Sequence, residues 1–370
     1  MRKIFLVVFL FLSLGLVAAA QTATEYFDRG NNLFNQSDYP SAISDYSRAI
    51  AVDPTYIEAY RRRGLARFQI KNYAGAIQDL EKVLELRPGN ADAYFELGYA
   101  KMKMGNSTGA KEDFLRVIEI DPRYAKAYFY RGVIHGFNLE SASEMADYDT
   151  AIELDSSIDI FYSTRGGVRN TKGDHDGALA DFTAAIKLNP KLQVAYIQRA
   201  AELDRKKDLV GAIADYTKAI ELNPRDQRAY DSRASLYSQS KLYAAAAADY
   251  TKLLELDPTR FSLYASRGEV FRLNGDYDLA MKDYGVAFQT NDISSDVYAS
   301  VGEIQLIRKL YENAVLSFSK AIEKQAIEPS YYRGRAAAYR ALNRSDDAKK
   351  DEKKASQLEK QFPFLIKKSN

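Results

Sequence analysis

Tyr264-Ala-Ser-Arg-Gly268 and, sixteen residues after its arginine, Asp283-Tyr284 form one copy of the pattern that decides the fold. Its first tyrosine belongs to a series that recurs every 34 residues without insertion or deletion: Tyr26, Tyr60, Tyr94, Tyr128, Tyr162, Tyr196, Tyr230, Tyr264, Tyr298 and Tyr332. A fixed period of this length is the signature of a repeat architecture. We therefore predict one elongated array rather than the two or more globular domains that 370 residues would otherwise suggest.

Small and large residues alternate at fixed offsets within each period. With Tyr26 numbered position 4 of the first repeat, position 8 holds Gly30, Gly64, Gly98, Gly132, Gly166, Ala200, Ala234, Gly268, Gly302 and Ala336. Position 20 is Ala in every repeat except the fourth, which has Glu144, and position 24 is aromatic in most repeats. Two helices that cross closely need small residues set against large ones. The pattern predicts a pair of packed helices in each repeat.

The pattern resembles the tetratricopeptide repeat, a helix-turn-helix unit of the same length with small residues at positions 8 and 20, aromatic residues at 4 and 24, and often Pro at 32. Position 32 here holds Pro54, Pro88, Pro122, Pro190, Pro224 and Pro258. The resemblance covers residues 23–362 as ten tandem repeats, which start near residues 23, 57, 91, 125, 159, 193, 227, 261, 295 and 329. It implies an all-α fold, an α-solenoid that winds as a right-handed superhelix, with a concave groove lined mainly by the first helix of each repeat.

The turns have their own signals. Breaks such as Gly105-Asn106 and Gly275-Asp276 predict the start of the second helix of a repeat. Each second helix then runs into a pair such as Asp53-Pro54 or Asn189-Pro190. We expect the Asp or Asn of these pairs to cap the first helix of the next repeat, because such side chains accept hydrogen bonds from free N–H groups and Pro suits a first helical turn.

Positions 7 and 23 carry a repeated pair of opposite charges. Arg occupies position 7 in most repeats and Asp occupies position 23 in nearly all, as in Arg199 and Asp215. In the ninth repeat both are replaced, by Val301 and Ser317, whereas in the third only the Arg is lost. We expect an Arg–Asp pair to bridge the two helices of each repeat. The alternative is a charged ladder that binds a ligand.

The fourth repeat and the end of the chain depart from the pattern. Because Glu144 replaces the small residue at position 20, we expect looser packing between the helices of the fourth repeat. After Lys349 the sequence becomes a highly charged helix, which would cap the last apolar face of a solenoid. The apolar cluster within 362–366 either folds back on the tenth repeat or forms a sticky tail, and we assign residues 363–370 to a C-terminal tail.

The first twenty residues read as a secretory signal peptide. Arg2 and Lys3 precede an apolar run from Ile4 to Val17, and small residues follow at 18–20 before Gln21. The alternative is an uncleaved membrane anchor, because the apolar run approaches the length of a bilayer span. With cleavage after residue 20 we expect no stable membrane span, and a location in the periplasm or cell envelope, or secretion.

Composition argues against several kinds of chemistry. The chain has no Cys, which excludes disulfides, thiolate metal sites and cysteine nucleophiles. Without Arg2 and Lys3 the basic and acidic residues balance at 50 each, so a nucleic-acid partner is not expected. Of the two histidines, we interpret His135 as a core residue and His175 as a solvated turn residue. No catalytic residue, metal ligand or cofactor is predicted, and we expect a protein that is not an enzyme.

The predicted groove is aromatic in its N-terminal half and small and polar in its C-terminal half. Aromatic and Arg side chains are the types enriched in binding hot spots. The candidate binding residues are therefore Phe27, Arg61, Arg62, Phe68, Phe95, Tyr99, Met102, Phe129 and Tyr130. Packing between neighbouring repeats is the competing explanation for several of these rings.

We predict a non-catalytic interaction scaffold that binds a peptide or protein segment in the groove. Chaperone-binding tetratricopeptide proteins grip a terminal carboxylate with a Lys/Asn/Arg set, of which only Asn31 is present in the first three repeats, so this specialisation is not expected. Two alternatives stay open: a binding protein for a small ligand or glycan fragment, which a compact pocket of convergent polar groups would favour, and a self-associating structural array.

Overall fold

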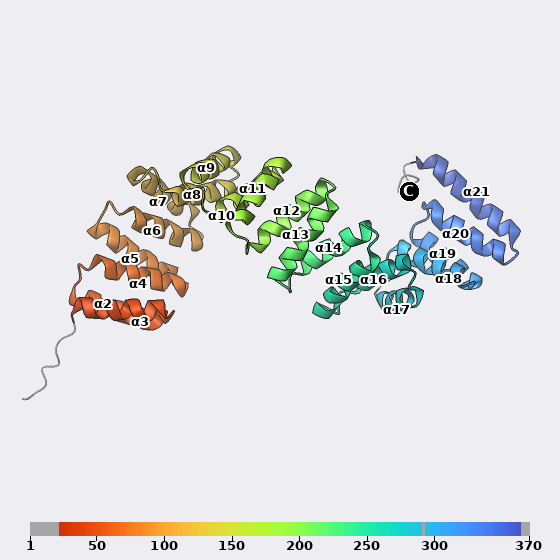
Figure 1. The fold of residues 1–370 in the computed structure, drawn as a ribbon, viewed down its shortest axis with the longest axis horizontal. Coiled ribbons are helices and arrows are strands. Elements are labelled where there is room, and N and C mark those ends of the chain that lie inside the picture. The colour runs from red at the N-terminus through yellow and green to blue at the C-terminus, as the bar shows by residue number, and fades with distance from the viewer. Residues whose placement is uncertain (1–21, 291–292, 364–370) are drawn as a thin grey trace, which may run out of the picture. The chain divides into compact units, whose positions relative to one another are not determined.

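The computed structural model describes residues 22–290 and 293–363 of the chain (Figure 1). The signal peptide predicted at residues 1–20 lies outside the described residues, as does most of the C-terminal tail. The chain divides into two compact units, residues 1–168 and 169–370, and the boundary falls within helix α10. Every regular element in the described residues is a helix.

The first helix of each repeat begins at a residue that the sequence period marks as a repeat start. These helices are α2 (Ala23–Asn35), α4 (Ile57–Gln69), α6 (Ala91–Lys103), α8 (Ala125–Phe137), α10 (Asp159–Thr171), α12 (Gln193–Arg205), α14 (Gln227–Gln239), α16 (Phe261–Asn274), α18 (Ser295–Ile307) and α20 (Pro329–Ala341). The second helices are α3 (Tyr39–Val52), α5 (Tyr73–Leu86), α7 (Ser107–Ile120), α9 (Ser141–Leu154), α11 (His175–Leu188), α13 (Leu209–Leu222), α15 (Tyr243–Leu256), α17 (Tyr277–Ala287), α19 (Tyr311–Lys324) and α21 (Ser345–Gln361).

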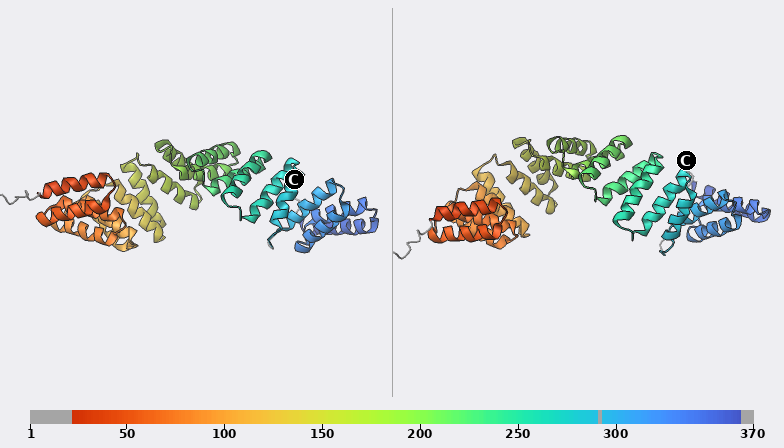
Figure 2. Two further views of the ribbon diagram at one scale, coloured as in Figure 1. Left: turned by 90° about the horizontal axis from the view of Figure 1, so that it is seen from below. Right: turned by 60° about the horizontal axis from the view of Figure 1, so that its bottom comes forward.

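Within each unit the helices pack in sequence order. Each first helix contacts the second helix of its own repeat, and that second helix contacts the first helix of the following repeat (Figure 2). Contacts between neighbours along the chain, repeated in register, are the packing of an α-solenoid. The predicted all-α solenoid is confirmed.

The core of each repeat lies where the sequence set small residues against large ones. The Ala side chains at position 20, such as Ala42 and Ala314, are fully buried. Phe318 at position 24 is also buried, and a Cβ atom built on Gly302 at position 8 would lie only 2.9 Å from its ring. The absent side chain at position 8 therefore allows the two helices of the repeat to approach.

The turn between the two helices of a repeat passes through a left-handed residue at position 15. Three of these residues are glycines, among them Gly105 at φ 88° and Gly275 at φ 87°. In five repeats the side chain of the next residue caps the second helix, as in the third, where Asn106 Oδ1 accepts a hydrogen bond from the N–H of Gly109 at 3.0 Å. The second helices begin directly after this turn, so their predicted starts are confirmed.

The Asp-Pro and Asn-Pro pairs play a different part from the predicted one. Asp53 ends α3 instead of capping α4, and its Oδ1 accepts from the N–H and hydroxyl of Thr55 at 2.9 and 2.7 Å. These bonds lower the pKa of Asp53. Tyr56 N–H donates to the Asp53 carbonyl at 3.1 Å, which closes a turn with Pro54 in its second place. The prediction of a helix cap was wrong because the side chain bonds within its own turn, two residues on.

An arginine at position 7 joins the two helices of most repeats. In the seventh repeat, Arg233 Nε and Nη2 donate to the carboxylate oxygens of Asp249 at 2.9 and 2.7 Å. Asp249 is buried, so the bidentate bond neutralises a carboxylate that would be costly to bury alone. Equivalent pairs are Arg29–Asp45, Arg63–Asp79, Arg131–Asp147, Arg199–Asp215, Arg267–Asp283 and Arg335–Asp351. The predicted bridge is confirmed at these pairs.

The same guanidinium also contacts the preceding repeat. Arg233 Nη1 donates to Thr217 Oγ1 at 2.9 Å, and its guanidinium carbon lies 5.8 Å from the centre of the Tyr230 ring. Corresponding bonds are Arg63–Ser47, Arg199–Thr183, Arg267–Thr251 and Arg335–Ser319. We call this repeated arrangement of position 7 Arg, position 23 Asp and preceding Ser or Thr the arginine lattice. Because the guanidinium is held on several sides, a structural role accounts for it better than a ligand-binding ladder.

Two repeats show how the arginine lattice tolerates loss of its arginine. In the third, Leu97 replaces the Arg, and Lys101 Nζ lies 2.8 Å from Asp113 Oδ2 one helical turn later. In the ninth, both charges are absent, and Ser317 donates to Gln305 at 2.8 Å. The buried carboxylate is thus kept only where a cation reaches it.

The fourth repeat packs as closely as the others, so the expectation of looser packing was wrong. Glu144 at position 20 is buried, and its carboxylate occupies space that a Cβ atom on Gly136 would fill. A glycine on the facing helix therefore accommodates the larger side chain. The turn that follows exposes two apolar residues, Phe137 and Leu139.

The last described helix closes the array. Phe362 packs beside Tyr332, Ala355 and Leu358, so the first residue of the apolar cluster at 362–366 contacts the tenth repeat, while residues 364–370 lie outside the described part. Among the described helices, none combines the length and the apolar character that a bilayer crossing needs.

Candidate binding surfaces

The first helices form the face on which ligand binding was predicted. Some of them contact their counterpart in the next repeat, as α2 contacts α4 in the first unit and α16 contacts α18 in the second. Side chains at positions 2, 5, 6, 9 and 12 of successive repeats can therefore meet. The nine candidate residues from the sequence all lie on α2, α4, α6 and α8, within the first unit.

Several of these residues come together around Tyr99. Its ring centre lies 5.3 Å from that of Phe68, 6.4 Å from Phe95 and 5.0 Å from Tyr130. Met102 packs in the same group. All five residues are partly buried, so each keeps part of its side chain in solvent. We call Phe68, Phe95, Tyr99, Met102 and Tyr130 the aromatic cluster.

Two other predicted rings serve mainly as packing. Phe129 is 3% exposed and stacks on Phe161 at 4.7 Å, so its ring is not presented to a ligand and we leave it out of the candidate surface. Phe27 is half-buried between Tyr46 and Tyr56, with ring centres 5.8 and 4.9 Å away. Packing between neighbouring repeats accounts for these two rings.

The two predicted arginines differ in their contacts. Arg61 Nε donates to both carboxylate oxygens of Glu96 in the next repeat, at 3.1 and 3.0 Å. This bond raises the pKa of Arg61, whereas burial raises the pKa of Glu96. The guanidinium of Arg62 lies 5.9 Å from the Phe34 ring. Arg61 therefore joins two repeats, and Arg62 borders the first-helix face beside an aromatic ring.

Both histidines lie beside carboxylates within the fold. His135 is buried, with Nδ1 against Glu140 and Nε2 3.6 Å from Asp147. It is a core residue, as predicted. His175 Nδ1 lies 3.0 Å from Glu202, a carboxylate that is 1% exposed. The interpretation of His175 as a merely solvated turn residue was therefore wrong, because its Nδ1 is buried beside a carboxylate on the next helix.

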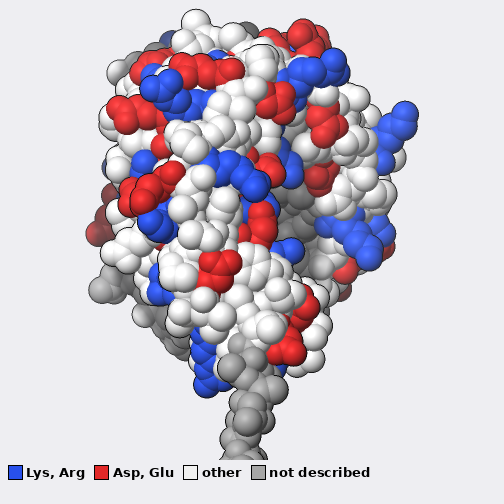
Figure 3. Space-filling model, turned by 90° about the vertical axis from the view of Figure 1, so that its left-hand side faces the viewer, with Lys and Arg blue, Asp and Glu red and all other residues white. Residues whose placement is uncertain are grey.

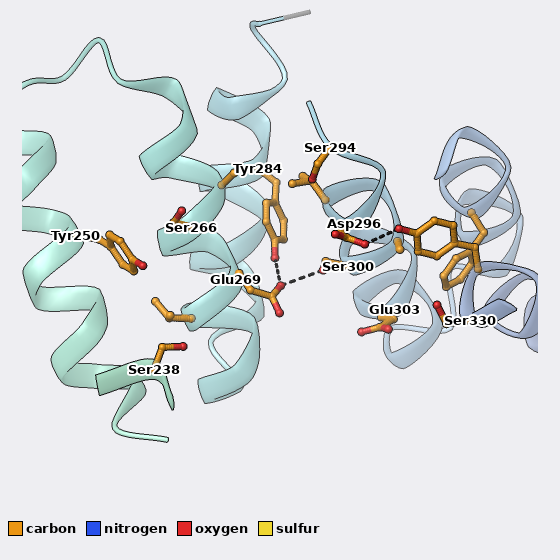
Figure 4. A pocket seen from close by; sticks show the side chains of 16 residues that line it. Ser238, Tyr250, Ser266, Glu269, Tyr284, Ser294, Asp296, Ser300, Glu303 and Ser330 are labelled. Carbon is orange, nitrogen blue, oxygen red and sulfur yellow. Dashed lines mark hydrogen bonds between the residues drawn. The ribbon is translucent and has the colours of Figure 1, made fainter. Parts of the chain in front are cut away.

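A cavity of about 560 Å³ opens on the first-helix face of the second unit (Figure 4). Its walls come from α14 to α20, that is, from repeats 7 to 10. The lining is Ser238, Tyr250, Ala265, Ser266, Glu269, Val270, Tyr284, Ser294, Asp296, Val297, Ala299, Ser300, Glu303, Phe318, Ser330 and Tyr331. We call it the C-terminal cavity.

Glu269 organises the middle of the C-terminal cavity. Its Oε2 accepts hydrogen bonds from the hydroxyls of Tyr284 and Ser300, each at 2.9 Å (Figure 4), and Arg272 makes a bidentate bond with the same carboxylate. Burial opposes ionisation of Glu269, but these bonds outweigh it and lower its pKa. In addition, burial and the negative charge of Glu269 raise the pKa of Tyr284. Glu269 is therefore a satisfied anion that fixes neighbouring groups.

Two further carboxylates face the C-terminal cavity. Asp296 at position 2 of the ninth repeat is exposed and accepts a hydrogen bond from Tyr331. Glu303 at position 9 has a half-exposed side chain that accepts from Arg272 Nη1 at 2.8 Å. Burial raises the pKa of Glu303, and the nearby Glu269 adds to this effect.

The sequence predicted the small polar character of this half of the groove but not its carboxylates. Glu269 and Glu303 both occupy position 9, one of the positions on the first-helix face, so their place on that face could have been read from the sequence. The tyrosine hydroxyls could not be placed in advance, because position 24 belongs to the core and only its hydroxyl end reaches the cavity.

Charges elsewhere on the surface are mixed. On the face shown in Figure 3, Lys and Arg side chains are interspersed with Asp and Glu side chains, with no broad patch of one sign. In the described part of the chain, no group of three or more His, Asp and Glu side chains is placed to hold a metal ion.

Comparisons with known proteins agree with this geometry. Family models described as tetratricopeptide repeat match residues 30–95, 68–129 and 227–260. The C-terminal part of a tetratricopeptide repeat protein from Cytophaga hutchinsonii is 19% identical, with a TM-score of 0.51, covering 64% of this chain and 97% of that one. A tetratricopeptide repeat protein from Parabacteroides merdae is 20% identical, with a TM-score of 0.43, covering 67% and 98%.

A crystal structure of MamA protein is 26% identical over 46% of this chain and 92% of that one, with a TM-score of 0.41. No curated protein matches the chain significantly. The matched models, the helix pairs in tandem and the likeness to the Cytophaga structure agree with one another. The chain carries tetratricopeptide repeats where these models match, and its described helix pairs have the tetratricopeptide solenoid fold.

Proposed function

We propose that this protein is an exported, non-catalytic scaffold that binds an extended segment of a partner protein along its first-helix face. The tetratricopeptide fold supports a role in protein interaction. The observation that carries the finer proposal is the aromatic cluster, in which rings from three successive first helices gather around Tyr99 and stay partly exposed. Aromatic side chains are among the types enriched in binding interfaces and their hot spots.

Removing the centre of the aromatic cluster is expected to abolish partner capture. The double variant Phe68→Ala and Tyr99→Ala should lose a partner that the mature chain retains from an envelope or secreted extract, because the loss of two hot-spot rings weakens binding by about tenfold or more each. The matched control is Phe137→Ala, which truncates an exposed ring in the turn of the fourth repeat.

Circular dichroism melts of all three proteins must first show equal helical content and stability. If the double variant retains the same proteins as the unmodified chain, the aromatic cluster is packing only. Sedimentation of the purified chain at increasing concentration separates this result from self-association, which would appear as growth without any partner.

Export is proposed from the sequence of residues 1–20, which precede the described part. We expect the protein recovered from a producing cell to begin at Gln21, as read by N-terminal sequencing. A chain that keeps its first residues and sediments with membranes would instead support the anchor interpretation.

The C-terminal cavity favours a second candidate, the binding of a small ligand. It gathers hydroxyl and carboxylate groups from four repeats around one space, and its volume lies within the range of about 300–1,000 Å³ of many ligand sites. The chemistry of that space can be argued further.

A further inference from the structure

We propose that the C-terminal cavity binds an organic cation, the ammonium or guanidinium head of a basic peptide side chain or of a free polyamine. The two sources share one chemistry, a cationic head on a methylene stem. The inference goes beyond the aromatic cluster, from which it is independent, since every lining residue belongs to the second unit.

The charge of the lining points to a cation. Three carboxylates face the cavity, from Glu269, Asp296 and Glu303, and the lining contains no Lys, Arg or His. Arg272 reaches the first and third from the side and divides its donors between them. The single positive charge of Arg272 is thus shared by two of the three carboxylates, which leaves an excess of negative charge inside the cavity.

The three carboxylates differ in how many hydrogen bonds they already accept. Glu269 accepts hydrogen bonds from three side chains, which hold its carboxylate in place in the cavity wall. Asp296 and Glu303 each have one described partner, and both are substantially exposed to solvent. Burial raises the pKa of Glu303, so its charge is the one that a bound cation would stabilise most. Asp296 and Glu303, about two turns apart on α18, are therefore the assigned receptors.

The rest of the lining suits a methylene stem. The lining also includes the apolar side chains of Val270, Val297 and Ala299. Long basic side chains pack their stems against such surface while their heads remain among polar groups.

A second cavity extends the same chemistry along the first-helix face. It measures about 390 Å³, shares Tyr250 with the C-terminal cavity, and contains Asp204 and Asp231. It, too, has no Lys, Arg or His in its lining. Two adjoining acidic spaces favour ligands that carry more than one positive charge, such as an extended basic segment or a polyamine.

The test is titration calorimetry of the mature chain with three probes: a capped peptide of alternating lysine and alanine, the same peptide with glutamine in place of lysine, and spermidine. We expect the lysine peptide, spermidine or both to bind at least about tenfold more tightly than the glutamine peptide, the effect of one charge-assisted hydrogen bond. Tight spermidine binding identifies the cationic head as sufficient. Tighter binding of the peptide identifies a polypeptide source.

The variants separate the cavity from general charge effects. Asp296→Asn with Glu303→Gln keeps the shape and one acceptor oxygen on each side chain, removes both negative charges, and is expected to weaken cation binding by about tenfold or more. The matched control, Glu312→Gln with Glu323→Gln, removes two exposed carboxylates from α19 and should leave the affinity unchanged. The Phe68→Ala and Tyr99→Ala variant should also bind the cation normally, so that failure of the aromatic cluster and failure of this site are distinguishable.

The unmodified chain supplies a further measurement. Its affinity for the lysine peptide should fall as pH is lowered from neutral into the range in which carboxylates titrate. The pKa of Glu303 is raised, so its protonation begins first, beside Glu269 and Arg272. The proposal is overturned if neither cation binds more tightly than the glutamine peptide, if the control pair weakens binding as much as the cavity pair, or if the affinity does not change on acidification.

Discussion

Replacing Arg199 by alanine is expected to lower the free energy of unfolding by about 2–3 kcal/mol. The reason is that the variant leaves the carboxylate of Asp215 buried without its bidentate partner, whose Nε and Nη2 atoms lie 2.7 and 2.8 Å from its oxygens. Bonding to Asp215 raises the pKa of Arg199, so the cation remains charged across the range of interest. Urea denaturation followed by circular dichroism measures the loss, and hydrogen exchange assigns it to α12 and α13.

A double-mutant cycle isolates the pair. We expect Arg199→Ala, Asp215→Ala and the combined variant to show a coupling energy of about 1–3 kcal/mol. The matched control is Arg116 with Glu119, an ion pair at 2.6 Å whose side chains are 63% and 60% exposed, for which we expect no measurable coupling. Equal coupling in the two cycles would show that burial does not strengthen the arginine lattice.

The second large effect concerns two helical glycines with opposite expected signs. Gly334→Ala should destabilise the chain by about 1–3 kcal/mol, because the added Cβ would overlap the ring of Phe318, a buried residue that Gly302 approaches as well. Gly285→Ala should instead stabilise it by about 0.5–1 kcal/mol, because nothing lies within 4 Å of the new methyl group and alanine favours a helix.

The same thermal and urea melts measure both variants. The contrast tests packing directly, since the two substitutions add the same methyl group to the same kind of element. If Gly334→Ala stabilises the chain as Gly285→Ala does, then Phe318 can move aside, and the close approach of α19 and α20 is not what requires glycine.

The repeat period and its two small positions were enough to predict the helix pairs and the solenoid. This was possible because a repeat contacts mainly its neighbours. The same packing pattern therefore recurs in each of the ten repeats, and a departure in one repeat does not obscure it in the others. The Arg–Asp bridge was predictable for the same reason. The role of Asp53 was not, because an Asp before a Pro can cap a helix or close its own turn, and local backbone geometry chooses between them.

The candidate binding surface shows more clearly what the sequence could not predict. Phe95 and Phe129 both occupy position 5, yet the first stays partly exposed beside Tyr99 and the second is buried against Phe161. Periodicity places a side chain on a face, but the size of its neighbours on the next helix decides how much of it reaches solvent. Position alone therefore could not separate a binding ring from a packing ring.

What the sequence determined by itself is the architecture: ten repeats, their helices, and the charge pair that joins them, because these follow from local spacing and nearest-neighbour contact. What only the tertiary structure decided is which polar groups converge. Glu269, Ser300 and Tyr284 come from three helices, and their meeting in one cavity depends on how far each repeat is rotated against the next, which small differences in side-chain packing set.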